Sequence, residues 1–184
     1  MVFVLLGLFY NEHLHITKES KLITMTTENP NAILNILLAD DDKDDRFFFA
    51  KALEGLTVET KLRTVRNGQE LIEYLARNFE KLPDVLFLDL NMPRKNGSEC
   101  LTEIKSNKKI KEFPVIIYST SLNDEIADIL YQKGAHYYMR KCDLSELQIQ
   151  LQQMLSMLEK NNFKRPSRNR FILNEPCQEL IYTY

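Results

Sequence analysis

The stretch NILLADDDKDD, from Asn35 to Asp45, joins an apolar run to a group of aspartates. The apolar part extends from Ile33 to Ala39 and has the length and composition of a buried β-strand. Carboxylates this close together repel one another, and burying one of them without a partner is costly. The stretch therefore indicates a strand followed either by a solvated acidic turn or by a set of acids that share a cation.

Similar apolar segments recur along the chain and alternate with helical patterns. Further strands are predicted at residues 58–65, 85–88, 115–118 and 136–139, of which the first is more polar and suits a sheet edge. Helical patterns cover residues 44–56, 67–79, 96–107, 122–134 and 143–158. This alternation predicts a parallel α/β sheet that has helices on both faces and right-handed crossovers.

Local signals indicate the ends and the buried faces of these helices. Asn67 and Asp143 are expected as N-caps, Glu146 is expected to complete a capping box, and Gly134 is expected to follow the fourth helix. The residues expected on buried faces are Phe48, Ala52 and Leu53 in the first helix, Leu71, Ile72 and Leu75 in the second, Leu101 and Ile104 in the third, and Leu144, Leu147, Leu151, Met154, Leu155 and Leu158 in the fifth.

The length of 184 residues suits one compact domain with terminal extensions. We expect the domain at residues 33–160, an N-terminal extension at residues 1–32 and a C-terminal tail at residues 161–184. Met25 precedes a short polar lead into the first strand, which suggests the hypothesis that translation begins there. The tail carries a basic cluster that we interpret as solvated rather than as a nucleic-acid site: Lys164, Arg165, Arg168 and Arg170.

Composition argues against nucleic acid or a membrane as the main partner. The formal net charge is only −2, so any electrostatic function must be local. The apolar run MVFVLLGLFY at residues 1–10 is too short to span a bilayer and lacks the positive region of a secretion signal. The wide spacing of Cys100, Cys142 and Cys177 favours reduced thiols in a cytoplasmic protein over a zinc site or a disulfide framework.

Polar side chains follow four of the predicted strands. Asp40 and Asp41 follow the first strand, Asp89 the third, Ser119 the fourth and Lys141 the fifth. Open α/β sheets bind ligands outside the carboxyl ends of their strands, so these side chains are expected to converge. Three carboxylates at close quarters need a cation, and oxygen ligands suit Mg²⁺, which is often shared with phosphate oxygens. A lysine and a hydroxyl nearby could then hold the remaining oxygens of a phosphoryl group.

Four segments together resemble the receiver domain of two-component response regulators: ILLADDDKDDR, VLFLDLNMPRKNG, PVIIYSTS and GAHYYMRK. The resemblance extends from Ile33 to about Lys160. It rests on the acidic pair, the D-x-N-M-P motif, the hydroxyl after the fourth strand and the lysine after the fifth. It implies a flavodoxin-like, doubly wound, five-stranded sheet in the order 2-1-3-4-5.

The resemblance also implies a role for each polar residue. Asp89 looks like the phosphoacceptor, which would attack a phosphohistidine and become an aspartyl phosphate. Asp41 would be a direct Mg²⁺ ligand, Asp40 would act largely through water, and Asn91 would contribute its backbone carbonyl. With Asp89, these groups form the implied metal site, and Mg²⁺ is the implied cofactor.

The same resemblance implies a conformational switch. Lys141 would pair with the phosphoryl oxygens, and Ser119 would reach toward the phosphoryl group. Tyr138 would move inward at the same time. Ser119 and Tyr138 would together form an element with two conformations, and the negatively charged phosphoryl group would favour one of them.

Two further features near the site have local interpretations. Cys142 stands where the family usually has proline, so we expect a trans peptide bond after Lys141 and a repositioned loop. Asp42 suits a helix cap, and Asp44 and Asp45 suit the first turn of a helix by charge–dipole attraction. None of these three acids is expected to bind the metal.

The implied function is that of a stand-alone receiver that a sensor histidine kinase or a histidine phosphotransfer protein phosphorylates on Asp89. It would catalyse only its own phosphorylation and dephosphorylation and would have no DNA-binding output domain. A downstream partner would dock on the face formed by residues 122–134, 136–139 and 143–158, and a homodimer is compatible with this arrangement. One alternative is an intermediate carrier in a phosphorelay. The other is a Mg²⁺-dependent phosphatase, which usually has a second acid where Asn91 stands.

Overall fold

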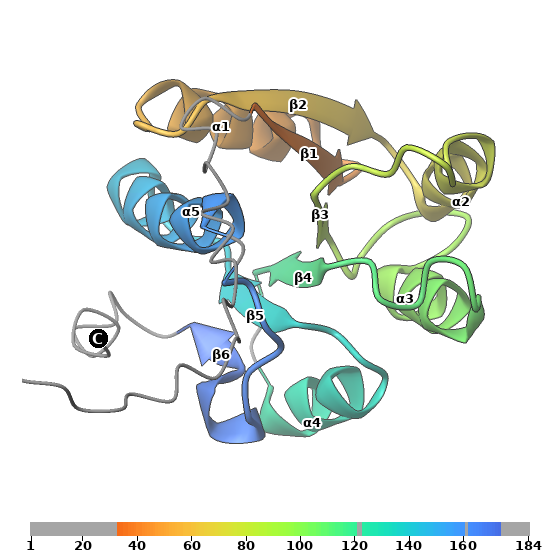
Figure 1. Ribbon diagram of the computed structural model, residues 1–184. Helices are drawn as coiled ribbons and strands as arrows, with labels where there is room; N and C mark the ends of the chain where they lie inside the picture. The colour runs from red at the N-terminus through yellow and green to blue at the C-terminus, as the bar shows by residue number, and fades with distance from the viewer. Residues whose placement is uncertain (1–32, 121–122, 161, 174–184) are drawn as a thin grey trace, which may run out of the picture.

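Six parallel strands form one sheet in the part of the chain that the computed structural model describes, residues 33–120, 123–160 and 162–173 (Figure 1). The strand order is β2-β1-β3-β4-β5-β6, and all neighbouring pairs are parallel. The strands are β1 Leu34–Ala39, β2 Thr60–Val65, β3 Val85–Leu88, β4 Val115–Ser119, β5 Tyr137–Arg140 and β6 Ile172–Leu173. The predicted flavodoxin-like class and the order of the first five strands are confirmed.

Among the described residues, five α-helices cover the two faces of the sheet. They are α1 Lys43–Glu54, α2 Gly68–Arg77, α3 Gly97–Ser106, α4 Asp124–Gln132 and α5 Leu144–Glu159. Figure 1 shows α1 and α5 on one side of the sheet and α2, α3 and α4 on the other. The core divides in the same way, since Phe49 and Leu151 belong to one apolar cluster and Leu71 and Leu101 to the other.

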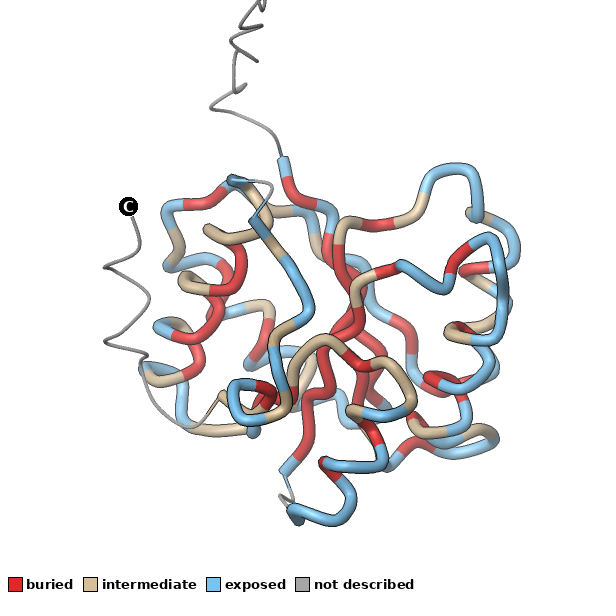
Figure 2. Tube along the Cα trace, turned by 60° about the horizontal axis from the view of Figure 1, so that its bottom comes forward, coloured by how far each residue is buried: buried red, intermediate tan, exposed pale blue. Residues whose placement is uncertain are grey.

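The central strands are apolar on both faces. Every residue of β3 and β4 is buried, and Asn35 is the one exposed residue of β1. Figure 2 shows these buried positions concentrated in the middle of the molecule. β2 lies at the edge and is mostly half-buried or exposed, as its polar sequence predicted. The carboxyl ends of β1 and β3 therefore emerge side by side from a fully packed interior.

Hydrogen bonds at the helix ends agree with most of the predicted caps. Asn67 and Asp143 each accept backbone N–H bonds from the first turn of α2 and α5 respectively. Gly134 follows α4 with a φ of +100°, in the left-handed region that favours glycine. The Glu146 side chain accepts a hydrogen bond from Gln150, so only the Asp143 half of the predicted capping box is formed.

The buried face of α1 differs by one residue from the prediction. Phe49 is fully buried together with Ala52, whereas Phe48 is 50% exposed. Any of the three consecutive phenylalanines could lie on the apolar face of the helix almost equally well. The N-cap at Asp42 fixes where the helix begins and therefore which phenylalanine faces the sheet. Three other residues expected in the core are only partly buried or lie at the surface: Ile72, Leu144 and Leu158.

The sixth strand corrects the predicted five-stranded sheet. β6 comes from the segment expected as tail, and it pairs in parallel with β5. Phe171, just before it, is fully buried, and its ring packs edge-on against Tyr131 and Tyr138. A strand of two residues is too short for a hydropathy pattern to indicate it. Residues 162–173 therefore pack along the edge of the sheet, while the domain bounds 33–160 stay a prediction.

Some predictions concern residues outside the described ranges. The N-terminal extension with the start at Met25, the end of the C-terminal tail and Cys177 all lie there. Cys100 and Cys142 are described and are free thiols. Among the described residues, no helix combines the length and the apolar character that crossing a membrane requires.

Candidate functional site

Two aspartates follow the central strands at neighbouring positions. The Asp40 backbone N–H donates to the carbonyl of Val65 at 3.1 Å, and the Asp89 N–H donates to the carbonyl of Ala39 at 2.9 Å. These bonds continue the strand pairing by one residue and place both acids at the carboxyl edge of the sheet. Asp40 is fully buried and Asp89 is 4% exposed, whereas Asp41 is exposed.

Carboxylate oxygens from Asp40, Asp41 and Asp89 lie within 4.8 Å of one another. Burial raises the pKa of both Asp40 and Asp89, and the nearby Lys141 opposes this rise. Three hard oxygen donors of this kind, one of them open to solvent, suit a divalent cation such as Mg²⁺ that keeps part of its water shell. The donor set therefore fits the predicted metal.

Backbone contacts hold both buried carboxylates in place. Asp40 Oδ1 accepts the N–H of Asp42 at 2.9 Å, and Asp89 Oδ2 accepts the N–H of Asn91 at 3.1 Å. Asn91 lies in the loop after β3, and its carbonyl stays a predicted ligand. Gly97 begins α3 so close to Asp89 that an added Cβ would lie 2.1 Å from the Asp89 carbonyl oxygen. Glycine at this position allows α3 to start directly beside the acid.

Lys141 inserts its ammonium among three carboxylates. Its Nζ atom lies 2.7 Å from Asp40 Oδ2, 2.7 Å from Asp45 Oδ2 and 3.5 Å from Asp89 Oδ1. Burial alone would lower the pKa of Lys141, but its close contacts with the Asp40 and Asp45 carboxylates raise it above its usual range. No cis peptide bond occurs among the described residues, so the bond to Cys142 is trans, as predicted.

Asp45 is the residue of this site whose contact the sequence reasoning missed. The sequence predicts an acid of the first helical turn, and Asp45 does lie there, but its carboxylate also pairs with Lys141. One signal could have indicated this contact. α1 starts two residues after Asp41, and Asp45 follows Asp41 by four positions, so the first turn of α1 lies at the same sheet edge as the acids.

Ser119 and Tyr138 lie on neighbouring strands next to the acids. Ser119 ends β4 and is fully buried, and its carbonyl accepts the backbone N–H of Lys141 at 3.0 Å. Tyr138 is fully buried on β5, and its N–H donates to the carbonyl of Phe171 at 2.8 Å. Burial raises the pKa of Tyr138, and the Ser119 side chain opposes this rise. Tyr138 is thus buried beside β4, and its movement on phosphorylation stays a prediction.

The sequence profile of the response regulator receiver domain matches residues 36–152. The chain belongs to this family. Response regulator Rcp1 of Synechocystis sp. is 33% identical over 110 residues, which cover 58% of this chain and 75% of Rcp1. The DNA-binding transcriptional regulator NtrC of Escherichia coli is 31% identical over 147 residues, which cover 79% of this chain but only 29% of NtrC.

Two solved structures of receiver proteins resemble this one closely. The Mn²⁺-bound form of Rcp1 has a TM-score of 0.62 and 29% identity, covering 73% of this chain and 99% of Rcp1. The phosphorylated cyanobacterial phytochrome response regulator RcpA has a TM-score of 0.63 and 33% identity, covering 74% of this chain and all of RcpA. A receiver of this fold thus binds a divalent metal in one relative and carries a phosphoryl group in another.

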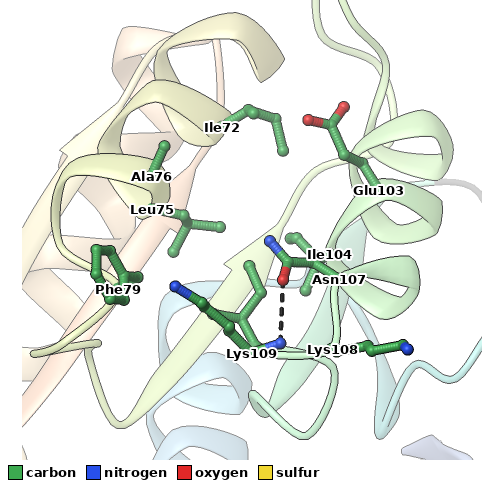
Figure 3. A pocket seen from close by; sticks show the side chains of 10 residues that line it. Ile72, Leu75, Ala76, Phe79, Glu103, Ile104, Asn107, Lys108 and Lys109 are labelled. Atoms are coloured by element: carbon green, nitrogen blue, oxygen red, sulfur yellow. Dashed lines mark hydrogen bonds between the residues drawn. The ribbon is translucent and has the colours of Figure 1, made fainter.

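A separate apolar pocket of this receiver lies away from the acids. Figure 3 shows it between α2 on one side and α3 with the segment that follows it on the other, where Ile72, Leu75 and Phe79 face Ile104. Its one carboxylate is that of Glu103, so it does not offer the clustered oxygen donors of the sheet edge. The clustered carboxylates and the ammonium of Lys141 are found instead at the carboxyl ends of β1, β3 and β5.

Proposed function

We propose that this receiver accepts a phosphoryl group on Asp89 from the phosphohistidine of a sensor kinase or a phosphotransfer protein. One observation carries the proposal: Asp89 is a buried carboxylate that lies between two further acids and the ammonium of Lys141. Members of this family signal by phosphorylation, which supports phosphoryl transfer to this receiver.

The transfer step follows from this arrangement. A carboxylate oxygen of Asp89 attacks phosphorus while the P–N bond to the donor imidazole breaks. The bonding electron pair leaves with the donor histidine, which takes up a proton from water. Lys141 then pairs with oxygens of the new aspartyl phosphate and offsets their negative charge.

Asp40, Asp41 and Asp89 would hold Mg²⁺ together with the carbonyl of Asn91. When bound, the ion supplies positive charge next to the phosphoryl oxygens. The exposed Asp41 is suited to direct ligation, because its side chain lies at the open side of the cluster. Asp40 already pairs with Lys141 at 2.7 Å, which supports a contact through water for this residue.

The phosphoryl group would act on the protein through Ser119 and Tyr138. The signal would be transmitted to the face formed by α4, β5 and α5, where we propose that a downstream partner or a second copy docks. Residues 162–173 lie along one edge of this face: Arg165 donates to the carbonyl of Ala135 at 3.0 Å, and Phe171 packs against Tyr138. Any partner of β5 must therefore contact or displace this segment.

A phosphorelay carrier would use the same transfer chemistry and then pass the phosphoryl group to another histidine. An aspartyl phosphatase is the weaker alternative, because such enzymes usually have a second acid two residues after the nucleophile, where this chain has Asn91. We propose a cytoplasmic location, where histidine kinases of two-component systems act through soluble receivers.

Incubation with acetyl phosphate and Mg²⁺ tests the proposal. The intact protein should gain the mass of one phosphoryl group, and Asp89→Asn should gain none while keeping its circular dichroism spectrum. Asp44→Asn removes the same charge from an exposed position nearby and serves as the matched control. Labelling of Asp89→Asn at the level of this control would contradict the assignment, and continuous release of phosphate would favour the phosphatase.

A further inference from the structure

We propose that Asp45 is a positioning residue that holds Lys141 in the unphosphorylated receiver and competes with the phosphoryl group for its ammonium. The inference rests on the proposed phosphorylation of Asp89 and extends it to a residue of α1. The carboxylate of Asp45 would thus set how readily Lys141 moves to the phosphoryl group.

The three acids around Lys141 differ in distance. Asp45 Oδ2 and Asp40 Oδ2 both lie 2.7 Å from Nζ, whereas Asp89 Oδ1 lies 3.5 Å away. Lys141 is therefore hydrogen-bonded to Asp45 and ion-paired with Asp40, and it is beyond normal hydrogen-bond distance of the phosphoacceptor. A phosphoryl group on Asp89 brings new negatively charged oxygens, and the ammonium must move toward them from the position that Asp40 and Asp45 hold at present.

Burial indicates which partner Lys141 leaves. The side chain of Asp40 is 0% exposed, and that of Asp45 is 39% exposed. A buried carboxylate that loses its cation is costly, whereas water can replace the cation at a partly exposed carboxylate. Asp45 is therefore the partner that can release Lys141, and the strength of its ion pair opposes phosphoryl binding.

A role of Asp45 confined to stabilising the first turn of α1 would be shared with Asp44. Asp44 and Asp45 are both acids of the first turn of α1, so both stabilise the helix by charge–dipole attraction. Asp45 also pairs with Lys141, which connects it to the end of β5, ninety-six positions along the chain. Substituting the two acids separately distinguishes the ion pair from the general effect of charge.

The test is the affinity for beryllofluoride, a mimic of the phosphoryl group, measured by titration calorimetry at saturating Mg²⁺. Asp45→Asn should bind the mimic about two- to fivefold more tightly than the unmodified protein, which is the range expected for a partly exposed ion pair. Asp44→Asn should bind within the error of the unmodified protein or more weakly. Asp45→Glu, which keeps the charge, should restore most of the original affinity.

Equal affinities of Asp45→Asn and Asp44→Asn would overturn the inference, as would weaker binding by Asp45→Asn. Asp45→Ser provides a second substitution without the carboxylate, should the amide form a new contact with Lys141. If the unmodified protein binds no beryllofluoride, then the proposed function itself fails. Binding by the unmodified protein with no difference between the two asparagine variants removes only the role of Asp45.

Discussion

Lys141 Nζ lies 2.7 Å from Asp40 Oδ2, so a fully buried carboxylate at the end of β1 is neutralised by a cation from the end of β5. β3 and β4 lie between these strands in the sheet. The pair therefore joins distant parts of the carboxyl edge and encloses Asp89. Removing one member of a buried pair leaves the other charge uncompensated.

Lys141→Met should consequently destabilise the protein by about 3 kcal/mol at neutral pH, since Asp40 would be left buried with its charge unpaired. Urea unfolding with fluorescence or circular dichroism measures this loss. The variant Lys141→Met with Asp40→Asn should recover part of the stability. An unchanged unfolding midpoint in Lys141→Met would show that the ion pair does not stabilise the fold.

The raised pKa of Asp89 predicts a pH dependence of stability. A folded-state pKa above the unfolded value of 3.8 means that the charged carboxylate disfavours folding at neutral pH. This penalty shrinks as the pH falls through the folded-state pKa, and it disappears only below 3.8, where the group is protonated in both states. Without Mg²⁺, Asp89→Asn should therefore raise the melting temperature at pH 7, and the gain should shrink as the pH approaches 4. A gain that grows with acidity would contradict this sign.

Mg²⁺ should stabilise the unmodified protein through the acidic cluster. At a concentration ten times its dissociation constant, a ligand that binds only the folded state adds about 1.4 kcal/mol. Asp41→Ala should abolish this increment, because Asp41 is the proposed direct ligand, and its exposed position should leave the fold intact. Thermal melts with Mg²⁺ and with a chelator measure the effect, with Asp44→Ala as the control. Equal stabilisation of both variants would remove Asp41 from the site.

Gly97→Ala should disturb the site through the backbone. Its Cβ would lie 2.1 Å from the carbonyl oxygen of Asp89, and backbone at such a distance must shift. We expect a loss of about 1–3 kcal/mol together with slower phosphorylation. Gly55→Ala is the matched control, since its Cβ would meet only the end of the flexible Gln148 side chain, at 2.3 Å. Equal losses of stability and equal rates of phosphorylation in Gly97→Ala and Gly55→Ala would contradict this effect of Gly97 on the site.

Phe171 tests whether the sixth strand belongs to the folded domain. The residue is fully buried against Tyr131 and Tyr138, so Phe171→Ala should cost about 3–5 kcal/mol. Ile172→Ala, at a half-buried position, should cost much less. Urea unfolding measures both. A loss below about 1 kcal/mol for Phe171→Ala would mean that residues 162–173 leave the sheet in solution.

The sequence predicted most of the fold because its central strands are buried on both faces. The bounds of β3 at Val85–Leu88 agree residue by residue, and the acid that follows falls at the sheet edge. β6 could not be predicted, since two apolar residues carry no periodicity. Phe48 and Phe49 could not be distinguished, because adjacent positions of one residue type fit the same helical face about equally well.

The candidate site was predictable to the extent that strand ends position it. Asp40, Asp89, Ser119 and Lys141 all follow or end strands, and the topology alone brings them to one edge. The contact of Asp45 with Lys141 depends on how the first turn of α1 is oriented toward the edge. Charge–dipole attraction favours acids at both positions of that turn equally, so the sequence did not separate Asp45 from Asp44.

The location of the phosphoryl group tests the central proposal most directly. After incubation with acetyl phosphate and Mg²⁺, borohydride reduces an aspartyl phosphate to homoserine, and tandem mass spectrometry of proteolytic peptides then locates the modified position. We predict homoserine at residue 89, with Asp84 of the same segment unmodified. Homoserine at residue 40, 41 or 84, or its absence from all four positions, would contradict the assignment of Asp89 as the phosphoacceptor.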